Sequence, residues 1–239
     1  MSVADTIRKI AQGRGITKLL HFTALENVES IVRYGFLSRA EMAIRGIVTR
    51  MSAPERIDRR RDAISLSIEQ PNFEMMKSKY SHLSGDVAWV LLHLSPEILW
   101  GNRCRFAYTN AAKTEILRGG ALCDGQAFED MFTRRGRHVP YIIGDNRTPS
   151  HPLDPHAEVQ VLERISPHHI TGAEVWGYKV AVVVDDALKA LPGEERNVES
   201  QSDRMYDYRP YDYDPPGYIW KPAPDGSLSF SKIDGHGIY

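Results

Sequence analysis

Apolar residues recur at every second position in two segments, AISLSI (residues 63–68) and AEVQVLE (residues 157–163). This period of two predicts strands that bury one face. In the second segment, the alternation places Glu158 and Gln160 together on the face opposite the apolar residues. The continuous apolar run AWVLLHLS (residues 88–95) predicts a buried strand.

Helical spacing dominates the N-terminal part of the chain. Residues 2–12 predict a short amphipathic helix, and residues 18–22 predict a short strand. In residues 23–38, apolar side chains fall on one face of a helix, with Thr23 as the expected N-cap and Gly35 as the expected left-handed C-terminal cap. The arginine-rich stretch that follows has poor periodicity, and we expect a short helix and then a mobile loop.

Short strands and helices alternate in the second half of the chain. CRFAY predicts a strand, NAAKTEIL and QAFEDMFTRR predict helices, and AEVWGYKVAVVV (residues 173–184) predicts another strand. The segment RHVPYIIGDNRTPSHPLDP is rich in turn-forming residues and predicts a loop. Short strands with interspersed helices are typical of an α+β domain rather than a doubly wound sheet.

The 239 residues suffice for one domain with an appendage, and 42% hydrophobic and 26% charged residues are ordinary for a globular protein. A change of composition predicts a principal domain over residues 1–192. Residues 192–204 are expected to form a linker. Residues 193–239, rich in Tyr, Asp and Pro, are expected to form a C-terminal extension that packs on the core or binds a partner.

Charge and cysteine content exclude several classes of protein. Thirty Lys and Arg residues against 31 Asp and Glu residues give a net charge of −1, which excludes a polycation that coats nucleic acid but allows a local basic groove. Two cysteines cannot form a disulfide framework or a four-thiolate zinc site. The first residues lack an apolar signal-peptide core, and the longest apolar run is too short to span a bilayer, so we expect a cytoplasmic protein.

Several familiar catalytic motifs are absent from the sequence. There is no G-x-x-x-x-G-K-[ST] phosphate loop, no G-x-G-x-x-G after a strand and no G-x-S-x-G elbow. Four histidines cluster along the chain, but their spacing matches no zinc pattern, and we expect no metal site. These histidines are His151, His156, His168 and His169.

Three features could carry chemistry, and each also has an ordinary structural explanation. His21, on a short apolar strand beside Thr23, is either a ligand-facing hydrogen-bond donor or a histidine satisfied at a strand end. The arginines of residues 45–61 form either a phosphate-binding clamp or a solvated charged loop. Glu158 follows a proline-rich loop at the start of a strand, where it is either catalytic or solvent-facing.

A series of short segments occurs in a characteristic order. It begins with H-x-T at His21 and a helix of the form N-V-E-S-I-V-x-Y-G-F-L-S. The later segments are R-I-D-x-x-x-D-A-I-S-L-S-I (56–68), P-N-F-E-M-M (71–76), L-S-P-E-I-L (94–99), Y-T-N-A-A (108–112), A-F-E-D-M-F (127–132) and D-P-H-A-E-V-Q-V-L-E-R-I-S-P-H-H-I (154–170). Together they resemble the DarT family, NAD-dependent ADP-ribosyltransferases that modify bases of single-stranded DNA.

The resemblance implies a fold and two catalytic residues. The fold would be an ADP-ribosyltransferase-like α+β split β-sheet with peripheral helices and, here, a C-terminal extension. Glu158 would be the catalytic glutamate, and Arg56, which stands before the AISLSI strand, would be the essential arginine. Its rivals in the same stretch are Arg59, Arg60 and Arg61.

The resemblance also implies which residues bind the two substrates. NAD would be a consumed co-substrate, with His21 and Thr23 holding its nicotinamide-side ribose and amide. Asn72, Phe73 and Met76 would wall the nicotinamide pocket. The loop over residues 136–156 would recognise the acceptor, because aromatic stacking and cationic contacts commonly hold single strands. Its candidate contacts are Tyr141, Asn146 and Arg147.

The function that the resemblance implies is a toxin-type enzyme that moves ADP-ribose from NAD onto a nucleobase of single-stranded nucleic acid, with DNA as the expected acceptor. Such an activity would damage its own host, which implies an antitoxin protein and a setting such as phage defence. The same chemistry on single-stranded RNA is the closest alternative. Simple NAD hydrolysis, transfer to protein, and a non-catalytic member that binds nucleic acid or a partner remain further alternatives.

Overall fold

The computed structural model describes residues 1–50, 56–73, 75–76, 87–119, 122–134, 148–201, 218–222 and 228–232. The strands are β1 (Leu19–Ala24), β2 (Ile64–Ile68), β3 (Trp89–Leu94), β4 (Cys104–Ala107), β5 (Glu158–Val161), β6 (Ile170–Trp176), β7 (Asn197–Gln201), β8 (Tyr218–Pro222) and β9 (Leu228–Lys232). The helices are α1 (Val3–Arg14), α2 (Val28–Tyr34), α3 (Arg39–Arg45), α5 (Ile98–Gly101), α6 (Thr114–Gly119), α7 (Gly125–Thr133) and α8 (Tyr178–Leu188), with 3-10 turns η1 (Leu25–Asn27) and η2 (Pro167–His169).

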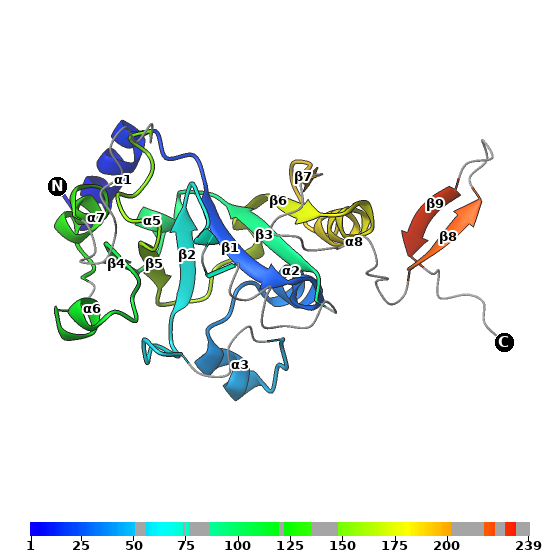
Figure 1. Ribbon diagram of the computed structural model, residues 1–239, viewed down its shortest axis with the longest axis horizontal. Coiled ribbons are helices and arrows are strands. Elements are labelled where there is room, and N and C mark those ends of the chain that lie inside the picture. The colour runs from blue at the N-terminus through cyan, green and yellow to red at the C-terminus, as the bar shows by residue number, and fades with distance from the viewer. Residues whose placement is uncertain are drawn as a thin grey trace.

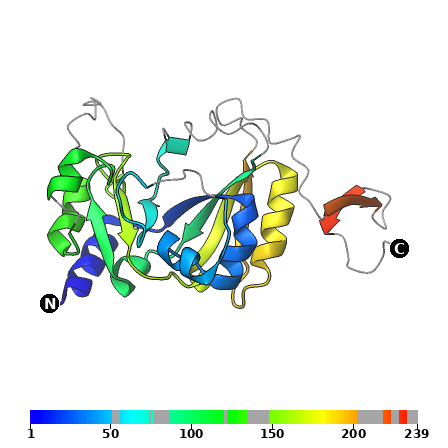
Figure 2. The ribbon, with the colours of Figure 1, turned by 90° about the horizontal axis from the view of Figure 1, so that it is seen from below.

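Seven strands form one sheet in the order β4-β5-β2-β1-β3-β6-β7, and β8 and β9 form a separate hairpin (Figure 1). Neighbouring strands of the sheet are antiparallel except β6 and β7, which are parallel. Helices α1, α6 and α7 gather at the β4 end of the sheet, whereas α2 and α8 lie at the other end (Figure 2). The α+β class predicted from the sequence is confirmed.

The sheet opens between its two central strands. β1 pairs with β3 along its whole length. With β2, in contrast, it shares only the pairs Leu19↔Ile68 and Leu20↔Ser67, and the two strands then diverge. The expected split sheet is therefore present, and the opening begins at His21.

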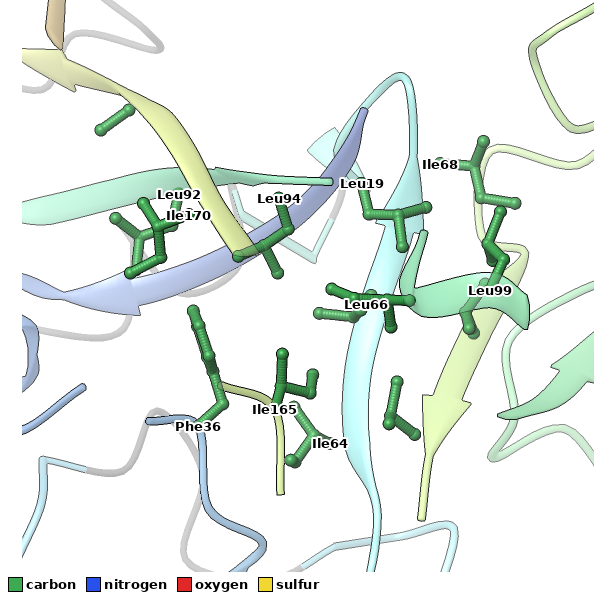
Figure 3. Close-up of a cluster of buried hydrophobic side chains, with 14 of the residues drawn as sticks. Leu19, Phe36, Ile64, Leu66, Ile68, Leu92, Leu94, Leu99, Ile165 and Ile170 are labelled. Carbon is green, nitrogen blue, oxygen red and sulfur yellow. The ribbon is translucent and has the colours of Figure 1, made fainter. Parts of the chain in front are cut away.

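One continuous core holds the two halves of the sheet together. Leu19 of β1, Leu66 of β2 and Ile165, in the segment between β5 and η2, are fully buried and lie together in this core (Figure 3). Gly35 brings Phe36 into this core, where Phe36 forms a β-bridge with Ile165. A Cβ on Gly35 would collide with the carbonyl oxygen of Ile165, and the φ of +77° also favours glycine. A larger residue at this position would push Phe36 out of the core.

Several local expectations are wrong. Thr23 does not cap a helix, because it lies in β1 and its buried hydroxyl accepts a hydrogen bond from Asn27. Gly35 ends α2 with a ψ of −178°, so its backbone is not left-handed helical. Gln160 does lie with Glu158 on the face opposite the apolar residues, and it is buried there at 1% exposure. A polar network fills that face.

The structure also differs from the expectations near residue 180. Residues 173–184 are not one strand, because β6 ends at Trp176 and α8 begins at Tyr178. The buried residues Val180, Val184 and Leu188 recur at helical spacing, which outweighs the strand preference of the valines.

The segment expected to be a linker, residues 192–204, contains β7, so the sheet extends beyond residue 192. No helix in the described part of the chain is long and apolar enough to cross a membrane.

Candidate active site

A pocket of about 350 Å³ lies where β1 and β2 separate. One wall carries His21 and Thr23 from β1, and the opposite wall carries Glu158 at the start of β5. Arg56, on the segment that leads into β2, lines the pocket between them. The split in the sheet therefore brings together residues far apart in the sequence.

Glu158 is the first residue of β5, opposite Ala107 of β4. Its Oε2 atom accepts a hydrogen bond of 3.4 Å from the Ala111 amide, and its Oε1 atom lies 3.7 Å from Arg56 Nη2. The side chain keeps 20% of its surface exposed toward the pocket. Burial raises the pKa of this carboxyl, and a hydrogen bond from Ser65 and the charge of Arg56 oppose that rise only in part.

Arg56 is held by an acidic partner and by two groups of the β2 strand region. Its Nε and Nη2 atoms donate to the two oxygens of Asp58 at 2.9 and 2.6 Å, which is a bidentate pair. Nη1 donates to the Ala63 carbonyl at 3.0 Å, and Nη2 donates to Ser65 Oγ at 2.7 Å. Burial alone would lower the pKa of Arg56, but Asp58 outweighs it and the pKa is raised.

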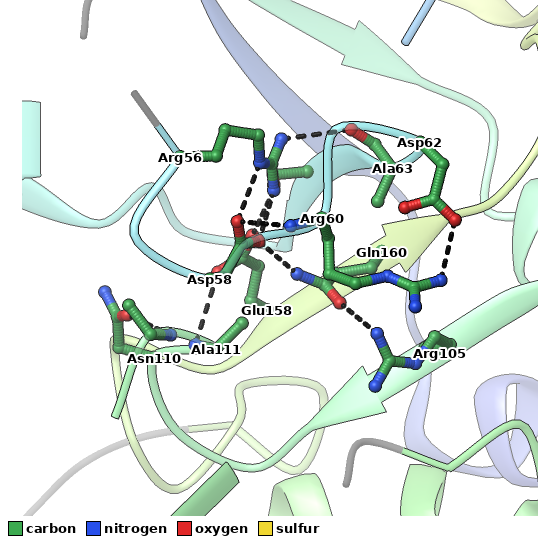
Figure 4. A network of polar contacts seen from close by, with 12 residues as sticks. Arg56, Asp58, Arg60, Asp62, Ala63, Arg105, Asn110, Ala111, Glu158 and Gln160 are labelled. Carbon is green, nitrogen blue, oxygen red and sulfur yellow. Dashed lines mark hydrogen bonds and ion pairs between the residues drawn. The ribbon is translucent and has the colours of Figure 1, made fainter. Parts of the chain in front are cut away.

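A buried network extends behind the Arg56–Asp58 pair (Figure 4). Gln160 Nε2 donates to Asp58 Oδ2 at 2.7 Å, and Arg105 Nη1 donates to Gln160 Oε1 at 3.1 Å. Burial opposes ionisation of Asp58, but the hydrogen bond and charge of Arg56 prevail and lower its pKa. Asp58 is therefore a carboxylate at neutral pH and fixes the plane of the Arg56 guanidinium beside Glu158.

The network distinguishes Arg56 from the neighbouring arginines. Arg60 pairs with Asp62 at 2.7 Å on the far side of the loop. Arg59 and Arg61 are exposed. Neither they nor Arg60 line the pocket. Among these four arginines, Arg56 alone lines the pocket, and its role as the essential arginine stays a prediction.

His21 faces the pocket from β1. Its Nδ1 atom donates to the Ser65 carbonyl at 3.1 Å, across the opening between β1 and β2. Its ring meets the Phe36 ring edge-on, with 5.0 Å between the centroids. Burial lowers the pKa of His21 to about 4. The imidazole is therefore neutral at pH 7, with Nε2 as a hydrogen-bond acceptor.

Thr23 and Asn27 link the same wall to the loop after α3. Asn27 Nδ2 donates to Thr23 Oγ1 at 3.1 Å and to the Arg50 carbonyl at 2.9 Å. Asn27 Oδ1 accepts from the Arg50 amide at 2.8 Å. Since Asn27 holds both backbone groups of Arg50, it fixes this loop at the edge of the pocket.

The remaining residues expected around the nicotinamide lie in different places. Asn72 lines the pocket, and its Oδ1 atom accepts from the Met75 amide at 3.0 Å. Met76 lines the pocket and is fully buried against Leu20, Leu91 and Trp176. Phe73 is 45% exposed and does not line the pocket.

The comparisons with known proteins bear on this pocket. The family model described as "DarT: ssDNA thymidine ADP-ribosyltransferase, DarT" matches residues 20–207. The chain belongs to the DarT family. This membership confirms the predicted family, whose description is that of an ADP-ribosyltransferase. No curated protein sequence matches the chain.

Three solved structures are similar to the chain at low sequence identity, and the first of them supports the fold. Thermosipho africanus DarTG in complex with ADP-ribose is 15% identical, with a TM-score of 0.53, over 77% of this chain and 50% of that chain. This chain thus spans about half the length of the Thermosipho protein. Thermus sp. 2.9 DarT in complex with NAD+ is 16% identical, with a TM-score of 0.47, over 76% of this chain and 94% of that chain. The complex of the same Thermus protein with ADP-ribosylated ssDNA is 16% identical, with a TM-score of 0.48, over 78% of this chain and 95% of that chain.

Tyr141, Asn146 and Arg147 lie outside the described residues. Among the residues that are described, no group of three or more His, Cys, Asp or Glu side chains could hold a metal ion.

Sequence reasoning missed three residues of the site: Asp58, Ser65 and Gln160. Asp58 stands in the R-I-D segment that located Arg56, and its spacing of two suits a bidentate pair. Gln160 shares a face with Glu158, which hinted at a common role. Ser65 gave no signal, because a serine on an alternating strand normally faces solvent.

Proposed function

We propose that this chain transfers ADP-ribose from NAD+ to a thymidine base of single-stranded DNA, with Glu158 as its catalytic carboxylate. The observation that supports the proposal most directly is the position of Glu158, partly buried at the pocket and 3.7 Å from an arginine that is itself fixed by Asp58. The family to which the chain belongs is described as an ssDNA thymidine ADP-ribosyltransferase, and this description also supports the proposal.

The proposed reaction begins with the glycosidic bond of NAD+. The bond between the ribose carbon and the nicotinamide nitrogen breaks, its electron pair leaves with nicotinamide, and positive charge grows on the ribose. The Glu158 carboxylate stabilises that charge at close range in a partly desolvated site. A ring nitrogen of the base then bonds to the ribose carbon, and its proton passes to Glu158. The raised pKa of Glu158 makes this carboxylate a better proton acceptor.

The other residues would bind and orient the substrates. Neutral His21 and Thr23 would hold the nicotinamide half of NAD+, with Asn72 and Met76 along the same part of the pocket. Arg56 would stay cationic and keep the Glu158 carboxylate in place while opposing the charge of nearby phosphate. A base must leave its stack to react, which favours a single-stranded acceptor.

We further infer an antitoxin partner, since an enzyme that modifies DNA bases threatens its own host. The Thermosipho africanus relative is described as DarTG, and this chain covers half of that protein. A cell-growth assay tests this inference: expression of the wild-type chain alone should stop growth, and expression of Glu158→Ala should not. Equal growth of the two strains would contradict it.

The proposed activity is tested by incubating the purified chain with NAD+ and a single-stranded oligonucleotide. Parallel samples contain a thymidine oligonucleotide, the same DNA without thymidine, and an RNA of matched sequence. Intact mass should show one ADP-ribose adduct on the thymidine oligonucleotide alone, and Glu158→Ala should give none. An adduct on RNA alone would move the acceptor to transcripts. Nicotinamide release without any adduct would leave NAD+ hydrolysis or a protein acceptor.

A further inference from the structure

Glu69 follows directly after β2 and joins that strand to β1. Its Oε1 atom accepts hydrogen bonds from the Thr17 amide, from Thr17 Oγ1 at 3.0 Å and from the Lys18 amide at 3.2 Å. The Glu69 amide donates in return to the Lys18 carbonyl at 3.2 Å. Since Thr17 and Lys18 directly precede β1, these contacts, here called the Glu69 clamp, fasten the start of β1 to the end of β2.

The Glu69 clamp lies at the closed end of the opening between β1 and β2. The two strands share two residue pairs, and the first of them joins Leu19 to Ile68, directly before Glu69. Beyond these pairs the strands diverge, and His21 Nδ1 donates to the Ser65 carbonyl across the gap. The separation of the two strands along the pocket therefore depends on how firmly they are joined at this end.

The backbone of Glu69 is in a left-handed conformation that glutamate rarely adopts. Its φ is +59°, and among the non-glycine residues in the described part of the chain only Arg59 shares a positive φ. Such a backbone is less strained in glycine or asparagine. Strained residues persist where surrounding contacts hold them, and here the hydrogen bonds to the carboxylate do so. The clamp thus accounts for a glutamate at a position that suits glycine.

The same turn leads from β2 into another part of the pocket wall. Pro71 and Asn72 come shortly after Glu69, and both line the pocket. Asn72 is buried, and its carbonyl accepts a hydrogen bond from the amide of the buried Met76 at 3.0 Å. Glu69 itself does not line the pocket, so any effect that it has on a bound molecule passes through the residues on either side of it.

We propose that Glu69 is a positioning residue for NAD+ binding, because its clamp sets the distance between His21 on β1 and Asn72 beyond β2. The inference rests on the proposed function, in which these two side chains border the nicotinamide half of NAD+. Without the clamp, the closed end of the opening loosens and the nicotinamide half is held less tightly. Glu158 has its own partners on other segments, so the chemical step should be largely spared.

Two substitutions of Glu69 separate the clamp from the turn. Glu69→Gly removes the carboxylate, and its backbone adopts the left-handed turn without strain. Glu69→Gln keeps the length of the side chain and one oxygen that accepts from the Thr17 and Lys18 amides. We expect Glu69→Gly to raise the KM for NAD+ in nicotinamide release about tenfold and to change kcat less than about threefold, as a weakened binding contact does. Glu69→Gln should recover most of the wild-type KM.

Glu163 offers a matched control at another pair of strands. Its Oε1 atom accepts from the Arg103 amide at 2.9 Å and from Asn102 Nδ2 at 3.0 Å, so it joins the start of β4 to the end of β5. Neither Glu163 nor these two partners line the pocket. Glu163→Gly should lower the melting temperature, as Glu69→Gly does, but keep the wild-type KM for NAD+. An equal rise in KM in both variants would reduce the effect to lost stability and overturn the proposal.

Nitrogen-15 NMR of the histidine side chains gives a readout that requires no NAD+. The signals of His21 are assigned by their loss in His21→Gln. Glu69→Gly should shift the Nδ1–H signal of His21, because the bond to the Ser65 carbonyl lengthens, whereas Glu69→Gln and Glu163→Gly should leave it in place. Either an unchanged KM or an unchanged His21 signal in folded Glu69→Gly would overturn the proposal.

Melting temperatures show whether each variant folds. If Glu69→Gly does not fold, Glu69→Asp replaces it, because aspartate tolerates the left-handed backbone and its carboxylate is one carbon shorter. The KM and the His21 signal then decide in the same way. A wild-type chain that releases no nicotinamide would overturn the proposed function and the role in NAD+ binding together. An active wild type whose KM and His21 signal do not respond to the substitution would overturn the role of Glu69 alone.

Discussion

The two walls of the pocket hold their functional side chains by different means. The β1 wall, defined by His21, Thr23 and Asn27, uses neutral groups bonded to one another or to backbone. The β5 wall, defined by Arg56, Asp58, Glu158 and Gln160, uses three charged groups and one amide that bonds to them. Charge is concentrated on the wall where, in the proposed reaction, positive charge develops on the ribose.

This difference also separates what stabilises the fold from what serves the reaction. A buried charge is tolerated only when it is paired and hydrogen-bonded, and Arg56 and Asp58 satisfy each other in this way. Glu158 is less well satisfied, since its contacts are longer and burial raises its pKa. The residue proposed for catalysis is thus the least stabilised charge of its wall.

The largest expected effect follows from removing that charge. Glu158→Gln keeps the shape of the side chain, and we expect nicotinamide release to fall about 10²–10³-fold, the scale of a lost electrostatic contact to the transition state. The melting temperature at pH 7 should not fall, because burial disfavours the charged form of Glu158. Glu163→Gln, an exposed carboxylate two residues beyond β5, is the matched control and should retain the wild-type rate. If Glu158→Gln kept a tenth or more of the wild-type rate of nicotinamide release, the proposed catalytic role of the Glu158 carboxylate would be wrong.

The next effect concerns the stability of the β5 wall. Asp58→Asn leaves the guanidinium of Arg56 partly buried without its bidentate counter-charge, and we expect a loss of about 3 kcal/mol in the free energy of unfolding. For a chain of this size, this loss corresponds to a fall of roughly 6–12 °C in the melting temperature.

The control lies on the same loop. Asp62→Asn breaks the ion pair with Arg60. The side chain of Arg60 is 37% exposed and that of Asp62 is 54% exposed, so the free energy of unfolding should fall by less than about 1 kcal/mol. Equal losses for Asp58→Asn and Asp62→Asn, measured by urea denaturation, would show that burial does not set the strength of these pairs.

A pH-dependent effect distinguishes the β1 wall. The pKa of His21 is about 4 in the folded state and 6.5 for the ordinary side chain. The unfolded chain therefore takes up a proton at this site between these values, and the folded chain does not. The stability of wild type should be complete above pH 6.5 and decline as the pH falls toward 4.

The variant His21→Gln lacks this proton uptake and isolates its effect. Between pH 7 and pH 4.5, wild type should lose on the order of 2 kcal/mol more than the variant in urea denaturation. Parallel losses in the two proteins would mean that His21 is protonated inside the fold. The neutral character of the β1 wall would then be wrong.

The sequence predicted some residues of the two walls and not others. Alternation located β2 and β5, and the resemblance to DarT selected His21, Arg56 and Glu158, all of which line one pocket. Periodicity could not reveal Asp58 and Gln160, because a buried polar network looks like an exposed face in sequence. The helix α8 was missed for a related reason, since its valines have high strand preference and only tertiary packing selects the helix.

The smallest expected effect tests whether neutral bonds on the β1 wall are individually weak. Thr23→Val keeps the branched shape but removes the acceptor of Asn27 Nδ2, which retains the Arg50 carbonyl. A single neutral hydrogen bond contributes about 1 kcal/mol, so we expect the melting temperature to fall by roughly 2–4 °C. Thr23→Ser keeps the hydroxyl and controls for the lost bond. A loss as large as that of Asp58→Asn would mean that the β1 wall depends on its polar contacts as strongly as the charged wall does. The contrast between the walls would then lie in chemistry alone and not in stability.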